Sequence, residues 1–320
     1  MAIPSRDPLR ARSVALKQCL AVCMSLLAAC NADVAQDPAA TPQDEADPRS
    51  PFAFTKPSVV IALPKALREI SGMVALDDAR VACVQDEKGL LYEVALKDGA
   101  IASKTRFGPD GDYEGVARTS DRWFFARSDG VLLEVGIDKD GKLLAPEELA
   151  LALPQHDLEA LAFDPPVEGR AARLLLAGKE PPEGDKQERD QRFVLAFDPT
   201  KRALDEQPAW SLSRKTIRAQ AAELRGIARD GVEPPPKPKL AMHISEIAVQ
   251  PATGTLWILS GPDRALLAVD RAGSLLAFFV FDEALLPQPE ALAFLPCGDL
   301  VVASEGTDGP ATLVRFALRR

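Results

Sequence analysis

The chain has little of what common enzyme sites are built from. Its 320 residues include five cysteines and two histidines, and only two of the cysteines lie after Cys30. These two are too few for a zinc site without several histidines. No GxSxG, HExxH or P-loop motif is present, so the usual sequence signs of a serine hydrolase, a zinc peptidase or a nucleotide-binding enzyme are missing. The sequence leaves the question of catalysis open and favours a protein that is not an enzyme.

Long hydrophobic runs are also missing, since no apolar stretch reaches the length needed to cross a membrane. Residues 19–29 (CLAVCMSLLAA) form an apolar run of eleven, typical of a secretory signal peptide. A basic segment precedes it and contains Arg6, Arg10, Arg12 and Lys17. The run leads into LAAC at 27–30, which resembles the bacterial lipobox. We expect 1–29 to be a lipoprotein signal peptide and Cys30 to carry the lipid; the alternative is an ordinary signal peptide with a chance cysteine.

The segment that follows is poor in residues that a core would bury. Residues 30–57 are rich in Ala, Asp and Pro and have few large apolar side chains before Phe52 and Phe54, so we expect the lipidated cysteine to be followed by a disordered tether. Asn31 stands where Asp usually marks retention in the inner membrane. The lipobox resemblance therefore implies an anchor in the outer membrane of the bacterial cell envelope, with the membrane as a partner. Residues 58–320 are long enough to form a folded domain.

Positive charge is in the minority. Four of the 38 Lys+Arg and one of the 47 Asp+Glu lie within 1–29, and the remaining chain has a net charge of −12. This argues against nucleic acid as a partner and leaves room for a bound cation. Only Cys83 and Cys297 follow Cys30, and no spacing rule decides whether they pair.

A short apolar motif recurs along the chain. EALAF occurs at 159–163 and at 290–294, and a matching slot occurs in EISGMVALD, DYEGVART and HISEIAVQP. We call this slot the anchor; it is occupied by Ser71, Glu114, Glu159, Ser245 and Glu290. The anchors are spaced by 43, 45, 86 and 45 residues. A period near 44 is about the length of one four-stranded propeller blade.

Short apolar runs bounded by Gly, Asp and Pro follow each anchor and predict successive β-strands. We therefore predict an all-β fold, a β-propeller of five four-stranded blades. The run SVVIALP at 58–64 is predicted to complete the last blade and close the ring. The double spacing before Ser245 is predicted to hold a helical insertion near 215–228, whose apolar face contains Ile217, Ala221, Leu224 and Ala228. A six-bladed ring is the alternative.

The series REISGMV, DYEGVA, DLEALAFDP, HISEIAVQP and QPEALAFLPCGDLVVASEG resembles the SdiA-regulated family of exported bacterial β-propellers, over about residues 67–306. The chain departs from the family's usual form in DLEALA and QPEALA, where glycine more often follows the glutamate, and in a charged insert at 181–191. The resemblance implies a propeller and, more loosely, an acidic axial site that holds a cation such as calcium. It implies no particular reaction.

The innermost strand of each propeller blade lines the central channel, so the five anchors should form a ring at one mouth. Carboxylates this close together either take up protons or hold a cation. Because oxygen ligands suit Ca²⁺, we take calcium as a candidate cofactor and Glu114, Glu159 and Glu290 as candidate metal ligands. The candidate ligand-binding residues are Glu69, Ser71, Asp112, Glu114, Arg127, Glu159, Lys179, Ser245, Glu290 and Glu305. Alternatively, these glutamates pair with basic side chains and join blade to blade.

Both histidines lie just before anchors in the sequence. His156 precedes Glu159 by three residues and His243 precedes Ser245 by two, so these two are the candidate catalytic residues if the protein is an enzyme. The segment DKDGK at 138–142 is predicted to be a hairpin turn rather than a calcium loop, because leucine follows it where an EF-hand needs glycine.

Three functions fit these features. The first is a lipid-anchored propeller of the cell envelope that binds a small polar ligand or peptide at an acidic, Ca²⁺-occupied axial mouth. The second is a metal-dependent hydrolase of phosphoesters or lactones that uses the same carboxylate ring. The third is a scaffold whose blade faces bind other envelope proteins.

Overall fold

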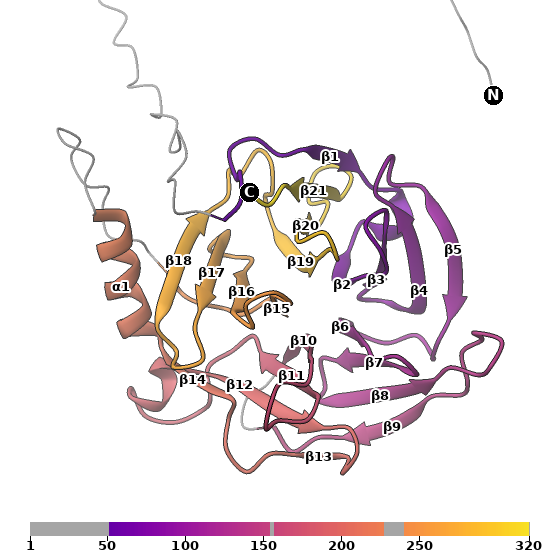
Figure 1. Cartoon of the computed structure of the whole chain (residues 1–320), viewed down its shortest axis with the longest axis horizontal. Helices are drawn as coiled ribbons and strands as arrows, with labels where there is room; N and C mark the ends of the chain where they lie inside the picture. The colour runs from indigo at the N-terminus through magenta and orange to yellow at the C-terminus, as the bar shows by residue number, and fades with distance from the viewer. Residues whose placement is uncertain (1–50, 154–156, 227–239, 320) are drawn as a thin grey trace, which may run out of the picture. The chain divides into compact units, whose positions relative to one another are not determined.

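The computed structural model describes residues 51–153, 157–226 and 240–319. These described residues belong to one compact unit, in which five antiparallel sheets surround a common centre (Figure 1). The innermost strands β2, β6, β10, β15 and β19 contact one another in this order, and β19 contacts β2. These contacts close the ring, so the chain is a five-bladed β-propeller, as the repeat predicts.

Each blade is an antiparallel sheet numbered outward from the centre. Blade one contains β2 (Ile70–Ala75), β3 (Arg80–Gln85), β4 (Lys88–Ala95) and β5 (Ile101–Arg106). Blade two contains β6 (Tyr113–Arg118), β7 (Arg122–Arg127), β8 (Val131–Gly136) and β9 (Glu147–Ala150). Blade four contains β15 (Glu246–Val249), β16 (Leu256–Ser260), β17 (Ala265–Val269) and β18 (Leu275–Val280).

Blades three and five depart from this simple order. Blade three contains β10 (Leu158–Asp164), β11 (Arg173–Gly178) and β12 (Gln191–Asp198), and a 3-10 turn (Glu188–Asp190) precedes β12. Its outer strand is in two pieces, β13 (Ala203–Leu204) and β14 (Trp210–Ser213), which pair with the two ends of β12. Blade five contains β19 (Pro289–Phe294), β20 (Leu300–Ser304), β21 (Thr312–Phe316) and, outermost, β1 (Val59–Ala62).

The first strand of the described chain closes the ring. β1 pairs antiparallel with β21, and Val60 lies opposite Val314, which confirms the predicted closure. A 3-10 turn (Lys65–Leu67) then leads into blade one. The end of the predicted tether also packs on the propeller, because Phe52 is fully buried and Phe54 is 7% exposed. The folded part of the chain therefore starts before residue 58.

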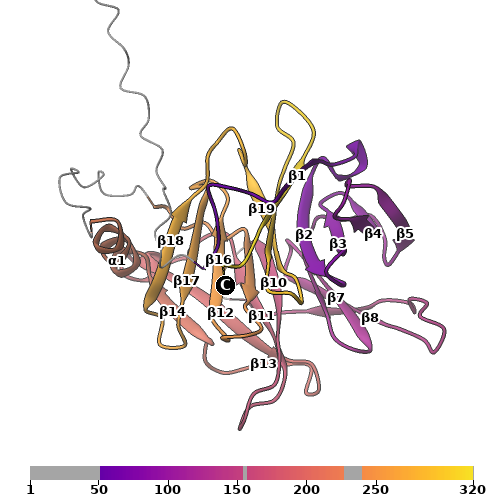
Figure 2. The same ribbon diagram turned by 45° about the horizontal axis from the view of Figure 1, so that its top comes forward.

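A helix lies between blades three and four, as predicted. α1 (Arg214–Gly226) follows β14 and packs on β18 and β14 at the outside of the ring (Figures 1 and 2). Ser213 caps it, since its Oγ accepts a hydrogen bond from the Thr216 N–H at 3.2 Å. Ile217 and Ala221 are buried on the predicted apolar face. The described residues between β14 and β15 contain no strand, which removes the six-bladed alternative, and no helix in the described ranges is long and apolar enough to cross a membrane.

Apolar side chains fill all five interfaces between adjacent blades. Between blades one and two, for example, Phe107 stacks on Phe125 and contacts Tyr113 edge-on. Each sheet thus buries both faces against its neighbours, which explains why the strands are continuous apolar runs rather than alternating ones. Burial of apolar side chains between the sheets holds the blades together. The polar side chains at the ends of the strands remain available to form a functional site.

The structure describes both the two cysteines and the segment 138–142. Cys83 and Cys297 are free thiols, so they do not form a disulfide. The segment 138–142 is a hairpin turn, as predicted: Asp138 Oδ1 accepts hydrogen bonds from the N–H groups of Asp140 and Lys142 at 2.9 and 2.8 Å.

Candidate functional site

The anchors occupy equivalent places in the five blades. In blades one, two, three and five the anchor is the second residue of the inner strand, and the pairing register shifts there. In blade four the Ser245 N–H donates to the Leu259 carbonyl at 2.9 Å while Glu246 pairs with the same residue. A bulge adds one residue to a strand and re-aims its side chain, so each anchor departs from the regular ladder at the same end of its blade.

Glu159 and Lys179 form the central contact of the site. Glu159 is buried, and its Oε1 lies 2.8 Å from the Lys179 Nζ. Burial lowers the pKa of Lys179, but the hydrogen bond with Glu159 and the charges of Glu159, Glu290 and Glu114 outweigh burial and raise the pKa above its usual value. One ammonium group is thus electrostatically linked to all three anchor glutamates, which come from blades two, three and five.

Glu114 holds its proton at neutral pH. Burial raises the pKa of its carboxyl to about 9, and the negative charges of Glu159 and Asp112 contribute to the increase. Burial also raises the pKa of Glu159, although the ion pair with Lys179 opposes this change. Lys179 thus balances the charge of Glu159, and the Glu114 carboxyl beside it stays protonated because no second cation among the described residues balances it.

Glu290 and Ser245 form a second part of the site. Burial raises the pKa of Glu290 to about 7; a hydrogen bond with Ser245 opposes the shift and the charge of Glu305 adds to it. The Ser245 Oγ accepts a hydrogen bond from the Gly261 N–H at 3.2 Å. A Cβ on Gly261 would lie 2.6 Å from the Glu290 Oε1 and 2.8 Å from the Ser245 Oγ, so this arrangement requires glycine.

Further carboxylates extend the cluster toward blade one. Burial, followed by the charges of Asp86 and Glu69, raises the pKa of Glu305 to about 7. Burial and the charges of Glu69 and Asp112 raise the pKa of Asp86 to about 6. The predicted site residues Glu69, Asp112 and Glu305 are therefore electrostatically joined to the anchors.

Glu246 belongs to the same cluster and was missed in the sequence. It is 1% exposed, and its Oε1 accepts hydrogen bonds from the N–H groups of Leu161 and Ile247 at 3.2 and 2.9 Å. Its Oε2 is buried without a hydrogen-bond partner among the described residues. Burial raises the pKa of Glu246 well above its usual value, and the charges of Glu159 and Glu114 raise it further.

A sequence signal for Glu246 did exist. The residue after the anchor is Gly72, Gly115, Ala160 and Ala291 in the other four blades. The slot is narrow, because a Cβ on Gly115 would lie 2.8 Å from the Leu161 Cβ. A glutamate in a slot that otherwise holds only small residues marks the blade in which the symmetry is broken.

Several predicted site residues have structural partners instead. The Ser71 Oγ donates to the Tyr113 carbonyl at 2.6 Å and joins blade one to blade two. Arg127 pairs with Asp129 and Glu148 at 2.9 and 3.2 Å.

Of the two candidate histidines, His243 lies in the described part of the chain. The His243 Nδ1 lies 3.2 Å from the Glu180 Oε1, and Glu180 is not one of the predicted site residues. His156 lies outside the described residues.

Calcium at Glu114, Glu159 and Glu290 stays a prediction. Across the described ranges, no three His, Cys, Asp or Glu side chains are grouped closely enough to hold a metal ion. A Ca²⁺ ion takes six to eight oxygen ligands. The Glu159 Oε1 is already paired with Lys179. A cation that enters the site would compete with Lys179 for this oxygen.

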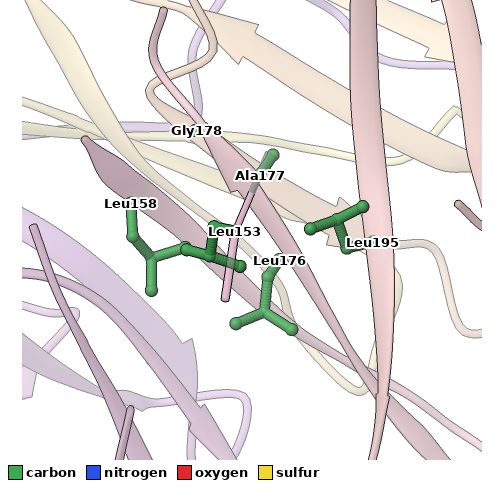
Figure 3. A pocket seen from close by; sticks show the side chains of 6 residues that line it. All are labelled: Leu153, Leu158, Leu176, Ala177, Gly178 and Leu195. Carbon is green, nitrogen blue, oxygen red and sulfur yellow. The ribbon is translucent and has the colours of Figure 1, made fainter. Parts of the chain in front are cut away.

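Two hollows in the described part of the chain lie at blade three. The first is an apolar gap too small for a water molecule (Figure 3), lined by Leu153, Leu158, Leu176, Ala177, Gly178 and Leu195. The second, of about 350 Å³, lies at the outer edge where β12 passes from β14 to β13. The first has no charged side chain in its lining, whereas the lining of the second includes Asp205 and Glu206 beside apolar side chains.

The fold is shared with solved bacterial β-propellers at low sequence identity. No protein-family model matches the chain, and no curated protein matches it in sequence. The glutaminyl cyclase of Myxococcus xanthus superposes with a TM-score of 0.51 at 13% identity, covering 83% of this chain and 97% of that one. The PQQ-bound aldose sugar dehydrogenase of Streptomyces coelicolor gives 0.47 at 13% identity, covering 82% and 98%. At these identities the likeness extends to the fold alone.

Proposed function

We propose that the protein is a binding protein of the cell envelope whose axial mouth takes a small polar ligand or peptide group with a positive charge. The observation that carries this proposal is Glu246: a buried carboxyl with an unpartnered Oε2, next to three anchor glutamates that share one lysine. Buried polar atoms normally have partners. A ligand that donates a hydrogen bond would give the Glu246 Oε2 a partner. Its positive charge would add to that of Lys179, which the three anchor glutamates share.

An ammonium or guanidinium group suits this site better than a metal ion. Such a group donates several hydrogen bonds in fixed directions and does not need six oxygen ligands. Its charge would favour the ionised forms of Glu114 and Glu290, whose pKa values are raised to about 9 and about 7. Binding should therefore release protons, and affinity should increase with pH through this range.

Calorimetric titration of the purified protein with L-argininamide and, separately, with CaCl₂ tests the proposal. Argininamide should bind, with a heat that differs between buffers of different ionisation enthalpy because protons are released. Glu114→Gln and Glu290→Gln should each weaken binding about tenfold or more, as loss of a charge-assisted hydrogen bond does. The exposed Glu283, paired with Arg264 at 3.3 Å, provides the control Glu283→Gln, which should bind like the parent.

The other outcomes distinguish the remaining functions. Binding of CaCl₂ alone, lost in the same variants, would replace the organic cation with calcium. If neither probe binds, or if Glu283→Gln weakens binding as much as the anchor variants do, the cation-binding mouth is refuted and the scaffold hypothesis gains. Turnover of phosphoester or lactone substrates that is lost in His243→Ala would support the hydrolase.

The envelope location is proposed from the sequence. The LAAC motif at 27–30 and the basic, apolar segment before it favour a lipid on Cys30. The resemblance to the SdiA-regulated family supports an exported propeller, and membership of that family is part of this proposal.

A further inference from the structure

Three arginines converge on one buried aspartate at the far end of β10. Asp164 is fully buried, and its Oδ2 lies 2.8 Å from the Arg170 Nη1. The Arg173 Nε donates to the same oxygen at 3.1 Å, and the Arg271 Nη1 and Nη2 donate to Oδ2 and Oδ1 at 3.1 and 3.2 Å. Glu159 and Asp164 are the second and last residues of β10, so about 17 Å of strand separates this arginine cluster from the acidic mouth.

The repeat itself shows that this cluster is unusual. Arg173 is the first residue of β11, as Arg80 and Arg122 are of β3 and β7. Arg80 pairs with two carboxylates, those of Asp77 and Glu93. Arg122 likewise pairs with two, those of Asp121 and Glu134. In blades one and two, then, each such arginine faces more negative than positive charge.

Blade three reverses this balance. Arg170, Arg173 and Arg271 share the single carboxylate of Asp164. Among the described residues, their one other acidic partner is Asp205, 3.8 Å from Arg173. A surplus of positive charge is thus concentrated in a chain that is otherwise strongly acidic. Like charges held together in this way cost free energy unless an anion offsets them.

The guanidinium groups are fixed in place and keep donors available. Arg173 and Arg271 lie 5.9 and 5.1 Å from the centroid of the Trp210 ring. Burial alone would raise the pKa of Asp164, but hydrogen bonds from Arg271 and Arg173 lower it, so the carboxylate stays charged and holds the arginines. Among the described residues, the Arg271 Nε and both terminal nitrogens of Arg173 have no hydrogen-bond acceptor.

We propose that Arg170, Arg173 and Arg271, held by Asp164 and Trp210, form a binding site for a phosphate group. A guanidinium presents paired N–H donors that match phosphate oxygens. A phosphate monoester carries about −1.5 to −2 charges at neutral pH and three acceptor oxygens, which is enough to offset the excess of three arginines over Asp164 and Asp205 and to accept hydrogen bonds from several guanidinium donors. The phosphate comes either from a small soluble molecule or from a lipid headgroup.

Titration of the purified protein with inorganic phosphate at constant ionic strength tests the site. Phosphate should bind the parent, raise its melting temperature and change the fluorescence of Trp210, which contacts two of the arginines. Arg271→Gln should weaken binding about tenfold or more. Arg80→Gln, which removes an exposed arginine that pairs with two carboxylates in blade one, should leave binding unchanged.

Additional variants and vesicles complete the test. Arg271→Lys keeps the charge and loses the paired donors, so it should bind with intermediate affinity and serves if Arg271→Gln does not fold. Vesicles of phosphatidylcholine with phosphatidic acid distinguish the source: binding to them alone, lost in the Arg271 variants, assigns the phosphate to a lipid. Absence of binding in both assays, or equal loss in Arg80→Gln, would overturn the proposal and leave Asp164 as a clamp between blades three and four.

Discussion

At the scale of single residues, the mouth depends on small side chains as much as on glutamates. A Cβ on Gly72 would lie 3.0 Å from the Gly115 Cα, and a Cβ on Gly115 would lie 2.8 Å from the Leu161 Cβ in blade three. The inner strands approach this closely because no side chain separates them. Glycine thereby brings the anchor carboxyls of neighbouring blades near enough to perturb one another's pKa values.

Gly261→Ala should damage the mouth directly. Its methyl group would collide with the Glu290 Oε1 and the Ser245 Oγ, so we expect a loss of roughly 1–3 kcal/mol in the free energy of unfolding, as overpacking typically costs. Urea unfolding measures this. A matched control is Gly309→Ala, because a Cβ there would meet nothing within 4 Å and should change stability by no more than about 0.5 kcal/mol. Equal effects of the two changes would refute the steric argument.

Stability should fall as pH rises through the neutral range. An unfolded Glu114 loses its proton near its ordinary pKa of 4.5, whereas the folded protein keeps it up to about 9. The stabilisation from the protonated form is complete below the lower value and is lost as pH approaches the upper one. Glu290 and Glu305, with pKa values of about 7, add to the fall between the ordinary value and neutrality.

Urea unfolding at about pH 5, 7 and 9 measures this pH dependence. Glu114→Gln should reduce the fall between pH 7 and 9, because Gln cannot ionise. Glu283→Gln, an exposed change, should keep the parent's slope. A parent whose stability rises over this range would show that Glu114 is not protonated in the folded state.

At the scale of elements, the chain that precedes β1 acts as a strap between blades four and five. The Phe52 ring lies 5.4 Å from the Trp257 ring and 6.1 Å from the Phe294 ring. Phe54 stacks on Phe279 at 4.3 Å. Because β1 completes the last blade, the strap and the closing strand stabilise the same junction of the ring.

Phe52→Ala should therefore be strongly destabilising. Removing a fully buried phenyl ring typically costs about 3–5 kcal/mol, and thermal or urea unfolding would measure the loss. Val60→Ala lies in β1 on the same segment but is 54% exposed, so it should cost less than about 1 kcal/mol. A small effect of Phe52→Ala would mean that the strap is dispensable for closure.

At the scale of the whole molecule, charge is divided between two ends of the blades. The anchors gather carboxylates at the start of the inner strands, and the arginine cluster lies at the end of β10. The two proposed sites therefore call for ligands of opposite charge. Each can be removed by substitutions that leave the other intact, so their tests are independent.

The expected lipid anchor is also a property of the whole molecule. Cys30→Ala should move the protein from the membrane fraction to the soluble fraction, because the acylated residue is lost. Cell fractionation with immunodetection measures the change. Cys297→Ala, a partly buried free thiol, should leave the distribution unchanged. Retention of Cys30→Ala in the membrane fraction would contradict the anchor.

The sequence by itself determined the architecture. A period near 44 residues, apolar runs of strand length and a spare N-terminal strand are local features, and each blade repeats them. The helix after β14 was predictable for the same reason, since its apolar face is written at helical spacing. The anchors could also be found, because the slot recurs at the start of every inner strand.

Only the tertiary structure decided what those anchors contact. Lys179 comes near all three anchor glutamates, Arg127 pairs elsewhere, and Glu246 reaches across to Leu161 in blade three. The arginine cluster likewise depends on Arg271, which arrives from the next blade. The physical reason is that a strand's pattern is set by its own residues, whereas the charge and burial around a side chain in a ring are set by neighbours from other blades, many residues away.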